Sequence, residues 1–298
     1  MDASVTRLLC GGFVLAFRFN HIMCDAQGIV QFLSAVGELA RGLPAATVSP
    51  AWSRELLEAR DPPEPTFPHH EYDPVPPSRR PLPPPGEMVT RTFNFSPANV
   101  AALKKSLPSH LRDTATTFDV VAASIWRART AALEVPPDED ARLAFPVTFR
   151  HVCELGLPAG YYGNAFVLPM AVAPAEALRS GSSLGDAVEL VREAKKAAAS
   201  AAEFVRSTAD LLALRGRPPP AMGNLFTVSD NRHVGFDRLD FGWGEPVYGG
   251  SASPMSWLSF LVAVRNGGDG EDAIAVPVML PQPAMDRFAS DLKSLLSI

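Results

Sequence analysis

A proline-rich stretch constrains the fold of this 298-residue chain most strongly, because 13 of its 29 prolines fall between Pro44 and Pro85. Proline lacks a backbone N–H donor and has a fixed φ, so a stretch this rich in proline cannot form a regular helix or a paired strand. We therefore expect a crossover linker over residues 44–87. It separates a short part, residues 1–43, from a large part, residues 88–298.

The residues before the linker predict a strand followed by a helix. Residues 13–19 are apolar except for Arg18 and include four β-branched or aromatic side chains, which is typical of a buried strand. Apolar residues then recur at helical spacing from Ile29 to Leu39, and Gly42 with Pro44 marks the end of that helix.

Patterns after the linker predict a mixed α and β structure. Thr116 with Asp119 has the spacing of a capping arrangement before a helix over residues 118–133, and Ser183 with Asp186 has it before one long helix that ends near residue 214. The other expected elements are strands over residues 88–95, 143–149, 165–172, 225–229, 257–264 and 273–280, and a helix over 283–296.

Composition excludes several classes of protein. Hydrophobic residues make up 47% of the chain, enough for a core, and the net charge of -5 provides no basic field for nucleic acid or anionic lipid. No apolar run reaches the ~18 to 20 residues that span a bilayer, and no signal peptide is evident. The three cysteines lack the spacing of a zinc site or a disulfide framework. We expect a soluble cytoplasmic protein without a metal, nucleic-acid partner or membrane partner.

The segment 19–28 places His21 and Asp25 four residues apart where the expected strand meets the expected helix. Such junctions often present catalytic side chains, and histidine suits a general base near neutral pH. The spacing alone also fits an ordinary loop histidine. Cys24 between them fits either a thiol nucleophile or a small buried apolar residue.

Four motifs in order resemble those of the plant BAHD acyl-CoA-dependent acyltransferases. They are the HxxxD pattern of His21 and Asp25, Ile-Trp-Arg-Ala-Arg-Thr at 125–130, Leu-Pro-Ala-Gly-Tyr-Tyr-Gly-Asn at 157–164 and Leu-Asp-Phe-Gly-Trp-Gly-Glu-Pro at 239–246. The resemblance extends from about residue 6 to residue 296. Residues 36–42 and 69–73 are similar to the alcohol acyltransferase branch, which includes benzoyl- and acetyltransferases.

The resemblance implies an α/β fold of two similar domains with mixed sheets, which meet at a channel leading to the histidine. It implies transfer of an acyl group from acyl-CoA, a co-substrate and not a permanently bound cofactor, to an alcohol or amine. Family members carry a long stretch before HxxxD, so we expect residues 1–43 to end an incomplete first domain and residues 88–298 to form the second. The alternative is a truncated, non-catalytic homologue that at most binds a ligand or a partner.

The family pattern also implies roles for single residues. His21 would be the general base, without a covalent acyl-enzyme. Asp25 would hold the loop by pairing with Arg150, since a buried charge needs a partner. Ser229 would donate to the oxyanion, although it also fits a serine that merely ends a strand. Asn231 replaces the tryptophan that some members carry.

Coenzyme binding is expected at Thr116, Thr117 and Asp230, because helix starts offer free N–H groups to anions and family members bind coenzyme A near these positions. Thr116 also fits a residue that only caps its helix.

Two further patterns are expected to be structural. Asp240, Gly242, Trp243 and Gly244 would shape the coenzyme channel from a distance, with Trp243 packed; the other motifs that accompany Asp-Phe-Gly in kinases are missing. The histidine-rich segment 69–73 lacks an ordered ligand spacing, so we expect solvated linker there instead of a metal site.

The expected oligomeric state depends on whether the first domain is complete. We expect a monomer for a complete chain, and self-association if the apolar strand and helix near the start lack cover.

Overall fold

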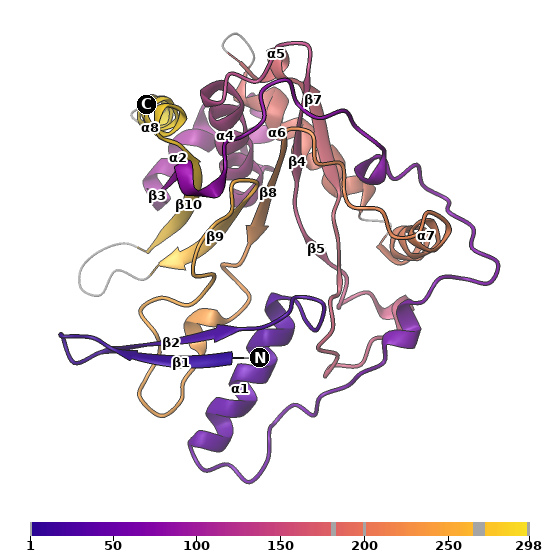
Figure 1. Cartoon of the computed structure of the whole chain (residues 1–298), viewed down its shortest axis with the longest axis vertical. Coiled ribbons are helices and arrows are strands. Elements are labelled where there is room, and N and C mark those ends of the chain that lie inside the picture. The colour runs from indigo at the N-terminus through magenta and orange to yellow at the C-terminus, as the bar shows by residue number, and fades with distance from the viewer. Residues whose placement is uncertain (1, 180–182, 199–200, 265–271, 297–298) are drawn as a thin grey trace.

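The computed structural model describes residues 2–179, 183–198, 201–264 and 272–296. Within them a six-stranded sheet runs in the order β3-β10-β9-β8-β4-β7 (Figure 1). Its strands are β3 (Met88–Phe95), β4 (Asp140–Ala144), β7 (Met170–Pro174), β8 (Leu225–Asp230), β9 (Leu258–Val264) and β10 (Ala273–Pro281). β8 lies parallel to β4 and β9 and the other pairs are antiparallel, so the sheet is mixed as expected.

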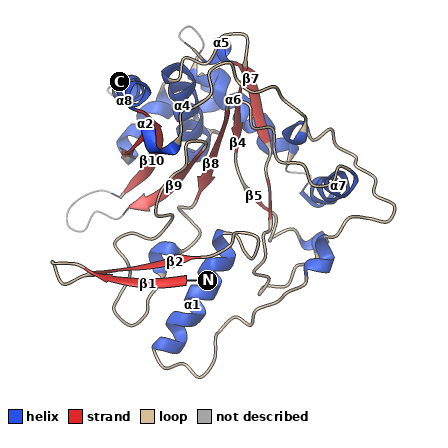
Figure 2. Ribbon diagram, in the orientation of Figure 1, coloured by secondary structure: helices blue, strands red, loops and turns tan. Residues whose placement is uncertain are grey.

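A layer of helices packs on this sheet (Figure 2). It contains α2 (Pro97–Lys105), α3 (Ser109–Arg112), α4 (Thr117–Ala132), α5 (Ala175–Leu178), α6 (Leu184–Ala197) and α8 (Gln282–Leu296). α4 contacts α2, α6 and α8, and Trp126 and Phe288 are buried in the core between helices and sheet. Capping boxes at Thr116 and Ser183 begin α4 and α6, which confirms both expected helix starts.

The N-terminal elements form a separate sheet and helix, seen below the main sheet in Figure 1. β1 (Asp2–Arg7) pairs antiparallel with β2 (Phe13–Arg18), and α1 (Ala26–Ala40) follows. The strand and helix are confirmed, but the expected burial of the strand is wrong, since Phe13 is 43% and Val14 49% exposed. Within the described residues β2 pairs only with β1, and an apolar strand is buried only when a second layer covers it.

The proline-rich linker contains no α-helix and no paired strand, as expected. It forms three short 3-10 turns, η1 (Arg54–Leu57), η2 (His70–Tyr72) and η3 (Pro85–Glu87). In Figure 1 the purple linker passes around the outer side of α7 (Ala201–Leu214).

Several expected elements are divided in the structure. The single long helix is wrong: α6 packs on α4, whereas α7 lies beside the linker and contacts η1, and residues 199–200 lie outside the described ranges. The strand expected over 143–149 is β4 and β5 (Val147–Thr148), and that over 165–172 is β6 (Phe166–Val167) and β7. Pro146 and Pro169 stand at the breaks, where a missing N–H interrupts the ladder.

No helix in the described parts is both long and apolar enough to cross a membrane.

Candidate active site

His21 lies in the loop between β2 and α1, and two other segments contact this loop. The side-chain amide of Asn164 donates to the His21 carbonyl oxygen over 2.8 Å, and Arg54 of the linker donates to the Met23 carbonyl over 2.6 Å. The exposed His21 ring has its centroid 6.4 Å from that of Phe166. Parts of the chain that are distant in sequence therefore place the imidazole at the surface of a structured loop.

Asp25 is buried directly beneath this loop and caps α1. Its carboxylate accepts hydrogen bonds from Gly28 N at 3.0 Å, Ala165 N at 3.0 Å and the Arg150 guanidinium at 2.7 Å. The ion pair between Asp25 and Arg150, expected from the resemblance, is therefore present. None of these bonds involves the His21 ring, so Asp25 orients the loop backbone and not the imidazole.

Arg150 joins the two motifs that meet at α1. Besides Asp25, its guanidinium donates to the Gly163 carbonyl over 2.6 Å. Gly28 lets α1 approach the same segment, because a Cβ there would lie 2.0 Å from the Tyr162 carbonyl oxygen. The loop after β5 and the start of α1 thus fit together without space for another atom.

Replacing Gly28 with alanine should destabilise the chain by about 1–3 kcal/mol, the usual range for overpacking, because a backbone carbonyl cannot move as a flexible side chain does. This loss should outweigh the higher helix propensity of alanine. Gly86→Ala is the matched control, since nothing lies within 4 Å of its added Cβ. Urea unfolding of both variants tests the close approach, and equal midpoints would contradict it.

Cys24 is buried, with 7% of its surface exposed. Burial raises the pKa of its thiol and the neighbouring Asp25 carboxylate raises it further, while Arg54 and Arg150 act in the opposite direction. A raised pKa keeps the thiol protonated and weakly nucleophilic. The geometry therefore favours the buried apolar residue over the thiol nucleophile.

Ser229 and Asp230 lie at the end of β8. The Ser229 hydroxyl donates to the Asn231 side-chain oxygen over 3.0 Å, and Arg232 donates to both carboxylate oxygens of Asp230 over 2.8 and 2.6 Å. Arg232 was not among the predicted site residues, although an arginine two residues after an aspartate at a strand end is a pattern typical of such a pair. Asp230 is thus paired with the Arg232 guanidinium. An anionic ligand at the end of β8 would meet a positive as well as a negative charge.

Thr116 and Thr117 begin α4, on the helical side of the main sheet. The Thr116 hydroxyl accepts from Asp119 N over 3.2 Å, and the Asp119 carboxylate accepts from Thr116 N over 2.9 Å. Lys195 of α6 donates to the same carboxylate over 2.8 Å. These bonds stay within α4 and α6, so they fit the capping alternative for Thr116; coenzyme binding there stays a prediction.

The loop at 240–244 is organised around the Asp240 carboxylate. It accepts from Gly242 N at 2.8 Å and Gly244 N at 3.0 Å, and both glycines have positive φ. The Gly242 bond lowers the pKa of Asp240 most; Gly244 and Arg41 also lower it, against the raising effect of burial. Because Arg41 at the end of α1 also contacts the Asp240 backbone carbonyl, the loop is anchored to α1.

The expectation that Trp243 is packed is wrong. Its side chain is 73% exposed, and its ring contacts Phe13 of β2 edge-on at 5.2 Å between centroids. Trp243 packs against the β1–β2 hairpin, which is itself largely exposed. A bulky apolar side chain is therefore not buried merely because it is apolar.

Trp243→Ala should therefore lower the free energy of unfolding by no more than about 1.5 kcal/mol, the upper value for one aromatic pair. Trp126→Ala is the contrast, because deleting a fully packed tryptophan costs about 3–5 kcal/mol. Thermal unfolding of the two variants measures the difference, and a large loss for Trp243→Ala would show that this residue is packed in solution.

The expectation of solvated linker at residues 69–73 is also wrong in part. His69 is 2% and Glu71 6% exposed, whereas His70 and Asp73 form an outer pair at 2.8 Å. Residues of α7, distant in sequence, cover His69, so no local pattern indicated its burial. In the described ranges no group of three His, Cys, Asp or Glu side chains could hold a metal ion.

An open hollow of about 580 Å³ lies beside the His21 loop. Arg54, Asn164 and Phe166, which contact this loop, belong to its lining, together with apolar residues of α7 such as Val205 and Leu212. Arg54 Nε and Asn164 Oδ1 are buried and have no hydrogen-bond partner among the described residues. Glu58 and Arg217 line the hollow as well, so it combines apolar walls with polar and charged side chains, a mixture also found in small-molecule sites.

Comparison with known proteins gives consistent results. The transferase family matches residues 1–295. Benzyl alcohol O-benzoyltransferase of Petunia hybrida is 45% identical over 297 residues, which cover 98% of this chain and 64% of the relative. The chain therefore spans less than two thirds of that relative's length.

Solved structures share the fold. Vinorine synthase superposes with a TM-score of 0.69 at 20% identity, over 98% of this chain and 65% of that one. TRI101 of F. graminearum, solved with coenzyme A and deoxynivalenol, gives 0.69 at 18% identity over 94% and 66%. The α/β coenzyme A-dependent acyltransferase fold implied by the four motifs is thus the fold of this chain.

Proposed function

The chain belongs to the transferase family of plant BAHD acyltransferases, and on that premise we propose that it transfers an acyl group from an acyl-CoA thioester to an alcohol. One observation carries the proposal. The buried pair of Asp25 and Arg150 holds a loop that presents the exposed His21 beside an open hollow. An amine is the alternative acceptor.

In the proposed reaction His21 acts as a general base. It takes the hydroxyl proton as the acceptor oxygen attacks the thioester carbonyl carbon, and a tetrahedral oxyanion forms. The intermediate collapses with cleavage of the C–S bond, and the proton passes from His21 to the leaving thiolate. Ser229 would donate to the oxyanion, which requires its hydroxyl to turn away from Asn231. Since Cys24 is buried with a raised pKa, we propose direct transfer without an acyl-enzyme.

Acyl-CoA is the proposed co-substrate, with Thr116, Thr117 and Asp230 as candidate contacts. To these we add Arg232, whose guanidinium lies at the end of β8 and is partly buried. Arginine is a common phosphate ligand, but Nε and one terminal nitrogen of Arg232 bind Asp230, so a phosphate would have to share or displace this pair. We propose a cytoplasmic location and retain the division into residues 1–43, 44–87 and 88–298 as proposals.

A turnover assay beside a binding measurement tests the function. Benzoyl-CoA and benzyl alcohol are incubated with the full chain, and the ester is detected by chromatography, because a thiol reagent would also react with the exposed Cys10 and Cys153. Coenzyme A binding is measured by calorimetry. Binding without ester formation, across acetyl- and benzoyl-CoA and several alcohols, would favour the non-catalytic homologue.

We also propose that this chain self-associates through its N-terminal hairpin. Val5, Leu9 and Phe13 are 64%, 110% and 43% exposed, and within the described residues β1 has an unpaired edge. Apolar edges of this kind pair with other chains. Light scattering should show a mass that rises with concentration, and Leu9→Lys with Val14→Lys should suppress the rise. A constant monomer mass would refute the proposal.

A further inference from the structure

We propose that Arg60 is a positioning residue that sets the width of the hollow beside His21, and with it the size of the uncharged apolar group that the chain accepts. This inference rests on the proposed function, because it assigns the hollow to a substrate. It is carried by a set of contacts between the linker and α7 that lies outside the reacting centre.

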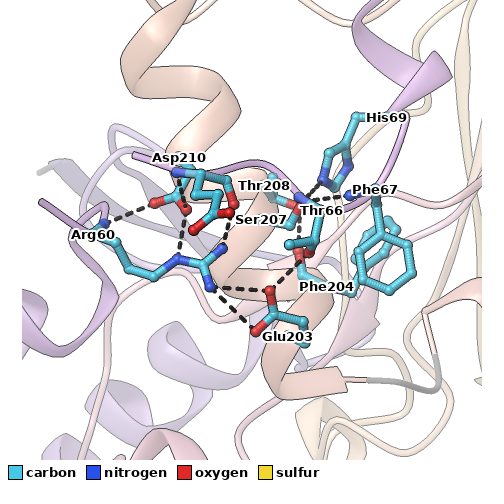
Figure 3. Close-up of polar contacts among 10 residues, drawn as sticks. Arg60, Thr66, Phe67, His69, Glu203, Phe204, Ser207, Thr208 and Asp210 are labelled. Atoms are coloured by element: carbon cyan, nitrogen blue, oxygen red, sulfur yellow. Dashed lines mark hydrogen bonds and ion pairs between the residues drawn. The ribbon is translucent and has the colours of Figure 1, made fainter. Parts of the chain in front are cut away.

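Arg60 links the linker to two carboxylates of α7 (Figure 3). Its backbone N donates to Asp210 Oδ1 over 2.7 Å, and its Nε donates to Asp210 Oδ2 over 2.6 Å. A terminal nitrogen donates to Glu203 over 3.0 Å. We call Arg60, Glu203, Ser207 and Asp210 the α7 clasp. Its three helical members are spaced i, i+4 and i+7 and therefore share one face of α7.

Ser207 extends the clasp along the linker. Its Oγ accepts from Thr66 N at 2.9 Å and Phe67 N at 3.0 Å, and lies 2.7 Å from His69 Nε2. Two backbone donors occupy its lone pairs, so the hydroxyl hydrogen goes to Nε2, and the His69 proton sits on Nδ1, 2.8 Å from Glu71. This tautomer gives the Ser207 hydroxyl and both His69 ring nitrogens a partner, which ties the linker to α7.

Asp210 makes the clasp energetically strong. The residue is 0% exposed and accepts a further bond from Glu64 N at 2.9 Å. Burial raises the pKa of this carboxyl, but the bonds from Arg60 and Glu64 lower it more, and the net pKa is below the usual value. Removing Arg60 would leave a buried charge without its cation, which strongly weakens the contact between the linker and α7.

The opposite face of α7 forms a wall of the hollow. Val205, Thr208 and Leu212 line it, and at 3.6 residues per turn they point away from the clasp. Linker residues 57–59 line the hollow too, directly before Arg60. The Arg60 guanidinium therefore connects the two walls, which are linker residues 57–59 and α7. If Arg60 moves relative to Asp210, the distance between these walls changes.

The lining indicates the chemical class of the bound group. Val205, Leu212 and Phe166 present hydrocarbon surface, and the Thr208 hydroxyl already donates to a backbone carbonyl over 2.8 Å. The other polar side chains of the lining are Arg54 and Asn164, which contact the His21 loop, and Glu58 and Arg217, which carry charge. This suits a primary alcohol whose hydroxyl lies near His21 and whose alkyl or aryl part fills the space along α7.

The test measures selectivity in the full chain. Binding of 1-butanol, 1-octanol and benzyl alcohol is followed by ligand-observed NMR for the parent, Arg60→Lys and Asp210→Asn. We expect both variants to change the ratio of the octanol Kd to the butanol Kd by about tenfold. One methylene group more or less in an apolar pocket has an effect of this size. Arg91→Lys is the matched control, because Arg91 pairs with the exposed Asp286 at 3.0 Å, away from α7.

Other outcomes overturn the inference. An unchanged ratio in Arg60→Lys would show that the clasp does not set the hollow, and this variant carries the test alone if Asp210→Asn does not fold. Ala209→Leu, which narrows the hollow, should weaken octanol binding selectively; no effect would show that alcohols bind elsewhere. A parent that binds alcohols with the expected selectivity but forms no ester would refute the proposed function and leave this inference standing. Ester formation with selectivity unaltered by the variants would do the reverse.

Discussion

Replacing His21 with alanine should lower kcat/KM for ester formation by about 10²-fold or more, the range for loss of a general base. The fold should survive, because the ring is exposed and the loop is held through the His21 backbone carbonyl, which alanine keeps. Chromatographic assay of the ester measures the loss, and thermal unfolding checks the fold.

The control for this experiment is His110→Ala. Like His21, His110 is exposed, but it lies in α3 on the helical layer, where its ring is 2.7 Å from Glu189. Its loss should leave turnover unchanged. A His21→Ala variant that keeps the full rate would contradict the proposed mechanism, whereas equal losses in both variants would indicate a general effect of removing a histidine.

Asp25→Ala should lower the free energy of unfolding by about 3–5 kcal/mol, the range for breaking a buried ion pair from one side. The change leaves the Arg150 guanidinium without its carboxylate and the N–H groups of Gly28 and Ala165 without their acceptor. Because this carboxylate also holds the His21 loop, turnover should fall as well. Urea unfolding and the ester assay measure the two effects.

A double-mutant cycle separates the pair from its surroundings. Arg150→Ala should also destabilise, but the double variant should lose much less than the sum, because the second change removes a charge that the first left unpaired. Arg91 and Asp286 form the matched exposed pair, where the coupling should be about 0–1 kcal/mol. Simple additivity for Asp25 and Arg150 would show that their contact does not stabilise the chain.

Local patterns predicted much of the fold. The capping spacing at Thr116 and the strand over residues 88–95 are confirmed, because each depends on neighbours a few residues away. The breaks within the strands expected over 143–149 and 165–172 were not predicted, although Pro146 and Pro169 stand at them. The ion pair of Asp25 and Arg150 was expected only through the family resemblance, because 125 residues separate the partners.

Burial was the property that local patterns predicted least well. The apolar strand near the start and Trp243 are exposed, whereas His69 in a polar proline-rich segment is buried. Burial depends on which layer lies over a residue, and that layer comes from elsewhere in the chain. An expected long helix became α6 and α7 for the same reason, because its two halves pack on different partners.

Proline, capping residues and motifs act over short distances, so the sequence indicated where the chain is extended, where helices begin and which residues are candidates for the chemistry. What these elements cover was set by the packing of the whole chain. This packing brought Arg60 to Asp210 across 150 residues and placed the other face of α7 beside the hollow. Such contacts arise when the whole chain packs, because the energy of a buried charge depends on partners that no local stretch contains.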